Sequence, residues 1–266
     1  MIAIFAAVTA SASAAMAVAW FLAERTGRSG WADATWSLSV GVLGAAAAAW
    51  PIDGVPALAS RQWIVGGVAL CWGLRLAIHI AWRTNMGGED PRYAELKRQW
   101  GDAKRSRLFW FLQIQAFVAA VLSLSIGIAA HYPLPNPRLL DCLGLLLIVA
   151  ALAGESIADR QLARFRARST GRAAVCDTGL WHFSRHPNYF FEWLTWVGYA
   201  AIAIDLEGRY AIGWLALAAP LLMYWLLVHV SGIPPLEAHM MRSRPQEFQD
   251  YWARVNAFWP GMPRIK

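Results

Sequence analysis

The sequence predicts an all-α membrane bundle of about seven transmembrane helices, and three observations carry this prediction. Apolar residues make up 58% of the 266 residues and charged residues only 15%, against roughly 45–50% and 25% in typical soluble proteins. The chain contains 16 tryptophans, a residue that concentrates where helices cross the membrane–water interface. Lysine and arginine gather in alternate connections between apolar stretches, as a polytopic bundle requires.

Seven apolar stretches follow one another along the chain, at residues 2–22, 37–52, 63–82, 108–130, 139–156, 189–205 and 211–231. Most of them approach the roughly 20 residues that a helix needs to cross a hydrocarbon core of about 30 Å. The second is shorter and Ala-rich, and it ends at Trp50-Pro51. The first has no basic residues before it and ends near Glu24-Arg25, so we expect a retained span rather than a signal peptide.

The basic residues orient the bundle. Of the 24 Lys and Arg residues, 20 lie after the first, third, fifth and seventh stretches, whereas Arg61, Arg138 and Arg209 lie on the other side. By the positive-inside rule the N-terminus is outside and the C-terminus cytoplasmic, in a membrane of the bacterial inner-membrane type. The net charge of +7 therefore reflects topology and not a nucleic-acid surface, and membrane lipids are expected partners.

Ionisable residues within or at the ends of spans are costly and are therefore candidates for function. Arg75 lies in the middle of the third stretch, Glu155 and Asp159 lie one helical turn apart, and Glu192 lies one turn beyond Asn188. The alternative is that such groups pair inside the bundle, for instance Arg75 with Glu155.

Asp33 and Trp36 begin the second span, where Asp33 suits a helix N-cap and Trp36 an interface anchor. Gln113 either lines a cavity or bonds to a neighbouring helix. The three cysteines form no CxxC or Cys/His pattern, and the histidines lack metal-ligand spacing, so no metal site is expected.

A specific pattern appears at Arg185-His186-Pro187-Asn188-Tyr189, followed by Glu192. Further segments accompany it in order: Asp33–Trp36, Trp72–Leu76, Glu89–Tyr93, Glu155–Gln161 and Ser231–Glu237. On these segments the chain resembles the bacterial branch of the steroid 5-alpha-reductase C-terminal family, a branch labelled only as a domain of unknown function. The resemblance implies a single domain over residues 1–266, with the family core at about 30–266. The wider superfamily includes sterol reductases and isoprenylcysteine carboxyl methyltransferases.

The resemblance implies a polar cavity on the cytoplasmic side that holds NADPH. The residues that it assigns to the cofactor are Arg75, Glu155, Asp159, Arg166, Trp181, Arg185, His186, Asn188, Tyr189, Glu192 and Glu237. Arginines suit the phosphates and an aromatic ring suits the adenine. We expect the substrate beside Trp36, Trp72 and Gln113. Trp72 stands where the steroid reductases have a tyrosine, so the resemblance does not single out a steroid.

The leading hypothesis is a reductase that transfers hydride from NADPH to an alkene conjugated to a carbonyl, in a steroid-like or isoprenoid substrate taken from the bilayer. The acid that stabilises the carbonyl oxygen would be Asp33, Glu89 or Tyr93. The alternative is an S-adenosylmethionine-dependent membrane methyltransferase, although the arginines fit the three phosphates of NADPH better. A third hypothesis is a noncatalytic lipid-binding or assembly protein whose polar clusters hold the bundle together.

Overall fold

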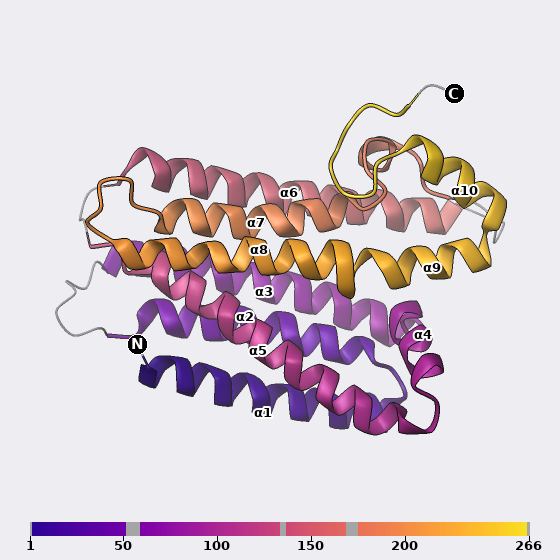
Figure 1. Ribbon diagram of the computed structural model, residues 1–266, viewed down its shortest axis with the longest axis horizontal. Helices are drawn as coiled ribbons and strands as arrows, with labels where there is room; N and C mark the ends of the chain where they lie inside the picture. The colour runs from indigo at the N-terminus through magenta and orange to yellow at the C-terminus, as the bar shows by residue number, and fades with distance from the viewer. Residues whose placement is uncertain (1, 52–58, 134–136, 169–174, 265–266) are drawn as a thin grey trace. The chain divides into compact units, whose positions relative to one another are not determined.

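The computed structural model describes residues 2–51, 59–133, 137–168 and 175–264, and all regular structure within these ranges is helical. The helices, drawn in Figure 1, are α1 (Ile2–Thr26), α2 (Gly30–Ala49), α3 (Ala59–Met86), α4 (Pro91–Trp100), α5 (Lys104–Ala130), α6 (Leu139–Arg168), α7 (Pro187–Ala203), α8 (Ala218–Trp225), α9 (Ile233–Ser243) and α10 (Pro245–Arg254). Short 3-10 helices precede three of them: η1 (Gly101–Ala103), η2 (Gly179–His182) and η3 (Ala211–Leu217). A π-helical segment, η4 (Leu226–Val230), joins α8 to α9.

Five helical segments within the described residues are long and apolar enough to cross a membrane. They are Ala3–Thr26, Ser60–Met86, Pro91–Ala130, Leu139–Arg168 and Ala211–Ser243. Each contains or overlaps one predicted apolar stretch, which confirms the prediction of an all-helical, multi-pass membrane protein at this level. The stretches predicted at 37–52 and 189–205 coincide largely with α2 and α7, which have 20 and 17 residues and are not among the five.

The chain folds into two compact units. The first comprises Met1–Gly144 and Tyr199–Ala219, and the second comprises Leu145–Gly198 and Pro220–Lys266. Because the boundaries fall within α6, α7 and α8, each of these helices contributes residues to both units.

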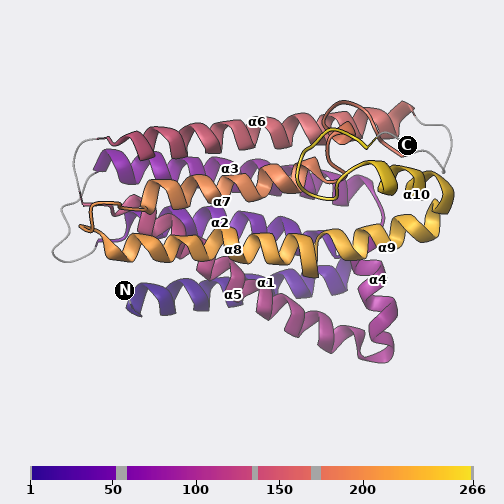
Figure 2. The ribbon, with the colours of Figure 1, turned by 45° about the horizontal axis from the view of Figure 1, so that its top comes forward.

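In the first unit α2 packs along α3, and α5 crosses α1 and α2 (Figures 1 and 2). The α2–α3 approach depends on two glycines that face each other. A Cβ added to Gly73 would lie 2.7 Å from the Cα of Gly41 and 2.7 Å from the carbonyl oxygen of Ser37. Small residues at helix contacts allow such close packing of membrane helices.

A network of charged and aromatic side chains closes one end of the first unit. Asp141 accepts hydrogen bonds from both terminal nitrogens of Arg61, at 2.8 and 2.6 Å, and from Nη2 of Arg138 at 2.8 Å. The Arg138 guanidinium lies 3.3 Å from the centre of the Tyr132 ring, and Tyr132 donates to Asp205 at 2.9 Å. All three arginines expected on the sparsely charged side therefore have an acidic partner within the protein, since Arg61 and Arg138 share Asp141 and Arg209 pairs with Glu207 at 2.7 Å.

In the second unit α6 and α7 meet where Gly154 faces the ring of Phe191, because an added Cβ would lie 2.4 Å from that ring. The indole N–H of Trp193 on α7 donates to the carbonyl oxygen of Pro220 on α8 at 3.0 Å. Rings from α7, α8 and the chain end after α10 then form one aromatic cluster: Phe190, Trp193, Tyr224, Phe258 and Trp259.

The segment after α10 returns to the turn that precedes α7. The backbone N–H of Arg185 donates to the carbonyl oxygen of Asn256, and that of Gly261 donates to the carbonyl oxygen of Phe183, both at 2.9 Å. The Ser184 hydroxyl donates to the carbonyl oxygen of Phe258 at 3.0 Å. The chain end thus fixes the backbone that carries the Arg185–Tyr189 motif.

Candidate functional site

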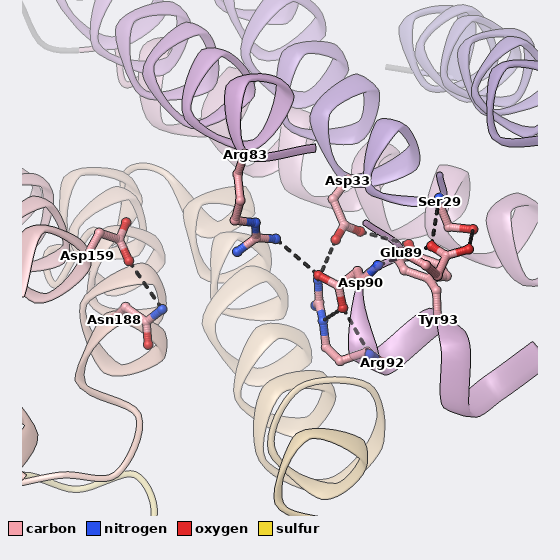
Figure 3. Close-up of polar contacts among 9 residues, drawn as sticks. All are labelled: Ser29, Asp33, Arg83, Glu89, Asp90, Arg92, Tyr93, Asp159 and Asn188. Atoms are coloured by element: carbon pink, nitrogen blue, oxygen red, sulfur yellow. Dashed lines mark hydrogen bonds and ion pairs between the residues drawn. The ribbon is translucent and has the colours of Figure 1, made fainter. Parts of the chain in front are cut away.

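Asp33, Arg92 and Tyr93 form a hydrogen-bonded cluster in the first unit (Figure 3). The Tyr93 hydroxyl donates to Oδ1 of Asp33 at 2.7 Å, and Nη2 of Arg92 lies 2.5 Å from Oδ2. Helix α2 begins at Gly30 after its N-cap residue Ser29, so Asp33 lies inside the first turn. The interpretation of Asp33 as an N-cap is therefore wrong, since the helix starts earlier than its apolar stretch indicates.

Helix α4 presents Arg92 and Tyr93 in its first turn because Asp90 caps it. The Asp90 carboxylate accepts from the backbone N–H of Arg92 at 2.9 Å, and Pro91 occupies the first helical position, where no N–H is needed. Asp90 also pairs with the Arg92 side chain at 3.1 Å and with Nη2 of Arg83 at 3.1 Å. Burial opposes ionisation of Asp90, but the charge and hydrogen bonds of Arg92 lower its pKa overall.

Tyr93 is the most deeply buried member of the cluster, with 3% of its surface exposed. Its ring meets Phe111 of α5 edge-on, with centroids 6.3 Å apart. A phenol in such a position donates one directed hydrogen bond, and the Asp33 carboxylate receives it while Arg92 balances the carboxylate charge. The arrangement can therefore present a proton donor whose orientation is set by an ion pair.

Glu89, the third candidate acid, has a different set of partners. Its carboxylate accepts from the backbone N–H of Ser29 at 2.8 Å and from the Ser29 hydroxyl at 3.3 Å, and it pairs with Nζ of Lys97 at 2.5 Å. It thus binds the start of α2 to α4 (Figure 3). These contacts give Glu89 a role in holding two helices together, separate from the Asp33–Tyr93 hydrogen bond.

The expected substrate residues all belong to the first unit, where Trp72 is buried and Trp36 and Gln113 are half-buried. Trp72 is 1% exposed and meets Trp36 edge-on at 6.5 Å, while the Trp36 indole N–H donates to the carbonyl oxygen of Gln115 at 3.1 Å. Gln113 accepts from the Ser13 hydroxyl at 2.6 Å, which favours the interpretation that it bonds α5 to α1. Trp36 lies inside α2 and not at its end.

Two of the expected cofactor residues meet in the second unit. Nδ2 of Asn188, at the start of α7, lies 3.4 Å from Oδ1 of Asp159 on α6, and Oδ1 of Asn188 accepts from the backbone N–H of Tyr189 at 3.1 Å (Figure 3). Asp159 and Asn188 are half-buried, and Glu155, one turn before Asp159, is buried. Arg166 is exposed near the end of α6. The pairing suggested between Arg75, which is half-buried on α3, and Glu155 stays a prediction.

Arg185 and His186 make contacts within the protein. Oε1 of Glu237 accepts from Nε of Arg185 at 2.7 Å and lies 3.0 Å from Nε2 of His186. Nη1 of Arg185 also donates to the carbonyl oxygens of Trp252 and Val255. Burial lowers the pKa of His186, although hydrogen bonding to Glu237 opposes this shift. These contacts join the motif to α9 and α10.

The remaining cofactor candidates, Tyr189, Trp181 and Glu192, also belong to the second unit. The Tyr189 ring stacks on that of His186, with centroids 5.5 Å apart and planes 11° apart. The buried Trp181 donates its indole N–H to the carbonyl oxygen of Ala158 at 3.0 Å, which fixes its ring against α6. Glu192 is buried and accepts from the Trp196 indole N–H at 3.3 Å.

Sequence reasoning did not single out Arg92 as a site residue, although it holds the cluster together. The pattern Asp90-Pro91 could have shown that a helix starts there, which places Arg92 and Tyr93 in one turn. The described part of the chain contains no group of three His, Cys, Asp or Glu residues that could hold a metal ion.

The family described as "Protein of unknown function (DUF1295)" matches residues 19–255. The match covers most of the chain and every candidate residue named above, and it confirms the expected relation to a family of unknown function. No curated protein and no solved structure matches the chain.

Proposed function

The chain belongs to the DUF1295 family, and from that premise we propose that it is a membrane-embedded, NADPH-dependent reductase of a carbon–carbon double bond conjugated to a carbonyl. The substrate is lipophilic, steroid-like or isoprenoid, and enters from the bilayer. The observation that carries this proposal is the hydrogen bond from the buried Tyr93 hydroxyl to the half-buried Asp33. A proton donor held in this way suits the oxygen of an enone, on which negative charge develops during reduction.

Tyr93 is the group that contacts the substrate in this proposal. Its hydroxyl turns from Asp33 to the carbonyl oxygen and donates the hydrogen bond that stabilises the enolate. Asp33 can release Tyr93 because Arg92 remains 2.5 Å from the same carboxylate and keeps its charge balanced. Asp33 and Arg92 are then positioning residues, and a proton from solvent completes the saturated carbon.

The polar residues of the second unit support NADPH as the reductant. When bound, NADPH supplies the hydride that adds to the β-carbon. The Asp159–Asn188 pair offers an amide and a carboxylate for polar groups of the nucleotide, and the exposed Arg166 offers a guanidinium for a phosphate. Arg185 fits this purpose less well, because Glu237 and two backbone carbonyls already engage its donors.

The proposed topology has seven spans, with α2 and α7 added to the five segments that qualify by length and composition. It has the N-terminus outside and the C-terminus and the cofactor cavity on the cytoplasmic side of a bacterial inner membrane. The support is the concentration of Lys and Arg after alternate spans. Seven spans place 20 of the 24 basic residues on one side, which six or eight would not.

The test uses the full chain purified in detergent. NADPH oxidation is followed with a panel of steroid and isoprenoid enones, and S-adenosylmethionine is offered in parallel with methyl acceptors. Tyr93→Phe should lower the rate by about 10²–10³ and leave NADPH binding unchanged. Tyr210→Phe is the matched control, because the Tyr210 hydroxyl donates only to the carbonyl oxygen of Ile128, at 3.0 Å, among the described residues.

Two results would overturn the proposal. One is full activity of the Tyr93→Phe variant on an enone that the wild-type chain reduces. The other is methyl transfer from S-adenosylmethionine without NADPH oxidation, which would establish the methyltransferase alternative.

A further inference from the structure

An open hollow of about 390 Å³ lies where the end of α1 meets η1 and the start of α5. Its lining residues are Trp20, Asp102, Ala103, Arg105, Ser106 and Phe109. None of them belongs to the Asp33–Tyr93 cluster, so the proposed reductase site does not account for this hollow. We propose that it binds one anionic phospholipid, with the phosphate at Arg105 and Ser106 and the start of an acyl chain against Trp20 and Phe109.

The apolar side of the hollow is held in place by direct contacts. The Trp20 indole N–H donates to the carbonyl oxygen of Arg105 at 3.1 Å, and the Trp20 ring meets Phe109 edge-on at 5.6 Å. Phe109 in turn contacts Trp110, which is 65% exposed, and Ile114 one turn farther along α5 is 62% exposed. An exposed apolar track therefore leads from the hollow along a segment long enough to span the membrane.

The polar side carries a positive excess that matches a phosphate. The Arg105 guanidinium lies 5.2 Å from the centre of the Trp20 ring and 3.5 Å from Glu24, and its side chain is 70% exposed. Lys104 and Arg107 flank it, and neither forms an ion pair with another described residue. Lys104 and Arg107 lie outside the lining, which carries Arg105 and Asp102, but with them the region around the hollow has three cations against two acids, Glu24 and Asp102, so an anion would balance the charge.

Because the hollow has an apolar side and a basic side, it favours a lipid over a free anion. Inorganic phosphate can use Arg105 and Ser106 but gains nothing from Trp20, Phe109 and the track beyond them. A zwitterionic lipid can use the apolar wall, but its own cationic group reduces its attraction to the basic side. An anionic phospholipid uses both, and Trp20 lies near the end of α1, the part of a spanning helix where tryptophans contact headgroups.

The experiment measures thermal stability and lipid retention of the full chain in detergent. Phosphatidylglycerol, phosphatidylcholine and inorganic phosphate are titrated separately, and native mass spectrometry counts the lipids that remain bound. We expect saturable stabilisation by phosphatidylglycerol, with one lipid retained per chain. Comparable binding of phosphatidylcholine would overturn the proposal, as would an equal effect of inorganic phosphate, which would indicate a free-anion site.

Four variants locate the binding. The double change Arg105→Gln with Ser106→Ala should weaken phosphatidylglycerol binding about tenfold or more. Ala103→Trp keeps every charge but fills the hollow, and it should also weaken binding. Asp102→Asn removes the opposing charge and should tighten binding about fivefold. Arg98→Gln removes one charge from an exposed side chain of α4 that does not line the hollow, and it should leave phosphatidylglycerol binding unchanged.

Unchanged affinity in the Arg105/Ser106 variant would overturn the proposal. If that variant fails to fold, the other two decide, because they alter an exposed alanine and an exposed aspartate. Unchanged affinity in both Ala103→Trp and Asp102→Asn would show that the hollow is not the binding site.

Discussion

Arg92 and Tyr93 are consecutive residues of α4, and both bind the carboxylate of Asp33 on α2, the guanidinium at 2.5 Å and the hydroxyl at 2.7 Å. One carboxylate thus joins a charge partner and a proton donor that share a helical turn. Since Asp90 fixes both the start of α4 and the Arg92 side chain, the orientation of Tyr93 depends on three charged residues.

Asp33→Asn should separate catalysis from cofactor binding. The amide keeps the shape of the carboxylate but removes its charge, so Arg92 keeps only Asp90 as a charge partner and Tyr93 donates to a weaker, neutral acceptor. We expect turnover on an enone to fall about 10²-fold while NADPH affinity stays close to that of the wild type. Steady-state kinetics and NADPH titration measure the two quantities. Equal losses in both would show that Asp33 acts in binding.

Glu89→Gln should affect stability and not chemistry. Its carboxylate holds the start of α2 through Ser29 and pairs with Lys97. Loss of a charge-assisted hydrogen bond should lower the free energy of unfolding by about 1.5–3 kcal/mol. Thermal unfolding in detergent measures this effect, and turnover per folded molecule is the check. A large fall in turnover at full stability would make Glu89 the acid instead of Tyr93.

Asn188→Ala and Arg166→Ala should weaken NADPH binding without unfolding the chain. Asn188 contacts Asp159 at 3.4 Å, and Arg166 is an exposed cation on the same helix as Asp159. Loss of a charge-assisted contact to the nucleotide corresponds to about a ten- to hundredfold loss of affinity. Arg164→Ala, another exposed arginine of α6, serves as the control. NADPH titrations that match the wild type for both variants would remove these residues from the cofactor site.

Gly73→Ala should destabilise the α2–α3 contact. The new methyl group would lie 2.7 Å from the Cα of Gly41 and from the carbonyl oxygen of Ser37, so two backbones must separate. Such overpacking costs about 1–3 kcal/mol. Gly67→Ala on the same helix meets nothing within 4 Å and should be neutral or slightly stabilising, because alanine favours the helix. Equal thermal stability of the two variants would contradict the close contact.

The stability of the second unit should depend on pH through His186. Burial lowers the pKa of His186 below its usual 6.5, so just below pH 6.5 the unfolded chain binds more protons than the folded chain. The stabilisation from neutral His186 is therefore complete above about pH 6.5 and is lost as the pH falls. His186→Gln should reduce the dependence of the unfolding temperature on pH between pH 5 and 7. An unchanged slope would assign the dependence to other groups.

Reporter fusions test the proposed topology. A fusion at the C-terminus and one after Thr26 should both report the cytoplasm, because the Lys and Arg residues concentrate in those connections. A fusion after Arg209, between α7 and α8, should report the outside. A periplasmic C-terminus would contradict the seven-span arrangement.

Helix positions were predictable from the sequence because they depend on local properties. Apolar length and the residues that end each stretch located the apolar part of each of the five candidate spans. The helix starts were less accurate at α2, because its first turn is polar and lies before the apolar stretch. Helix α4 was missed for the same reason, since it is short and charged, and only its capping pattern marks it.

The candidate residues were also found from the sequence, since ionisable groups stand out against an apolar chain. Their partners were not, because contacts between residues far apart depend on how helices pack. Asp33 meets Arg92 and Tyr93 across 59 and 60 positions, and nothing local in the sequence indicates that α4 folds back onto α2. Only the tertiary structure showed that Glu89 has a different role from the Asp33–Tyr93 pair, since Glu89 binds the start of α2.

Arg185 shows most clearly that the sequence identifies a capable residue whereas the tertiary structure decides its partners. The sequence identified it as a motif arginine suited to a phosphate, because a guanidinium binds any anion or carbonyl oxygen within reach. Which acceptors reach it depends on the path of the chain 50 to 70 residues later, where Glu237, Trp252 and Val255 supply them. The sequence by itself thus determined the helical membrane architecture and the chemically capable residues, and the tertiary structure decided which of them pair with one another.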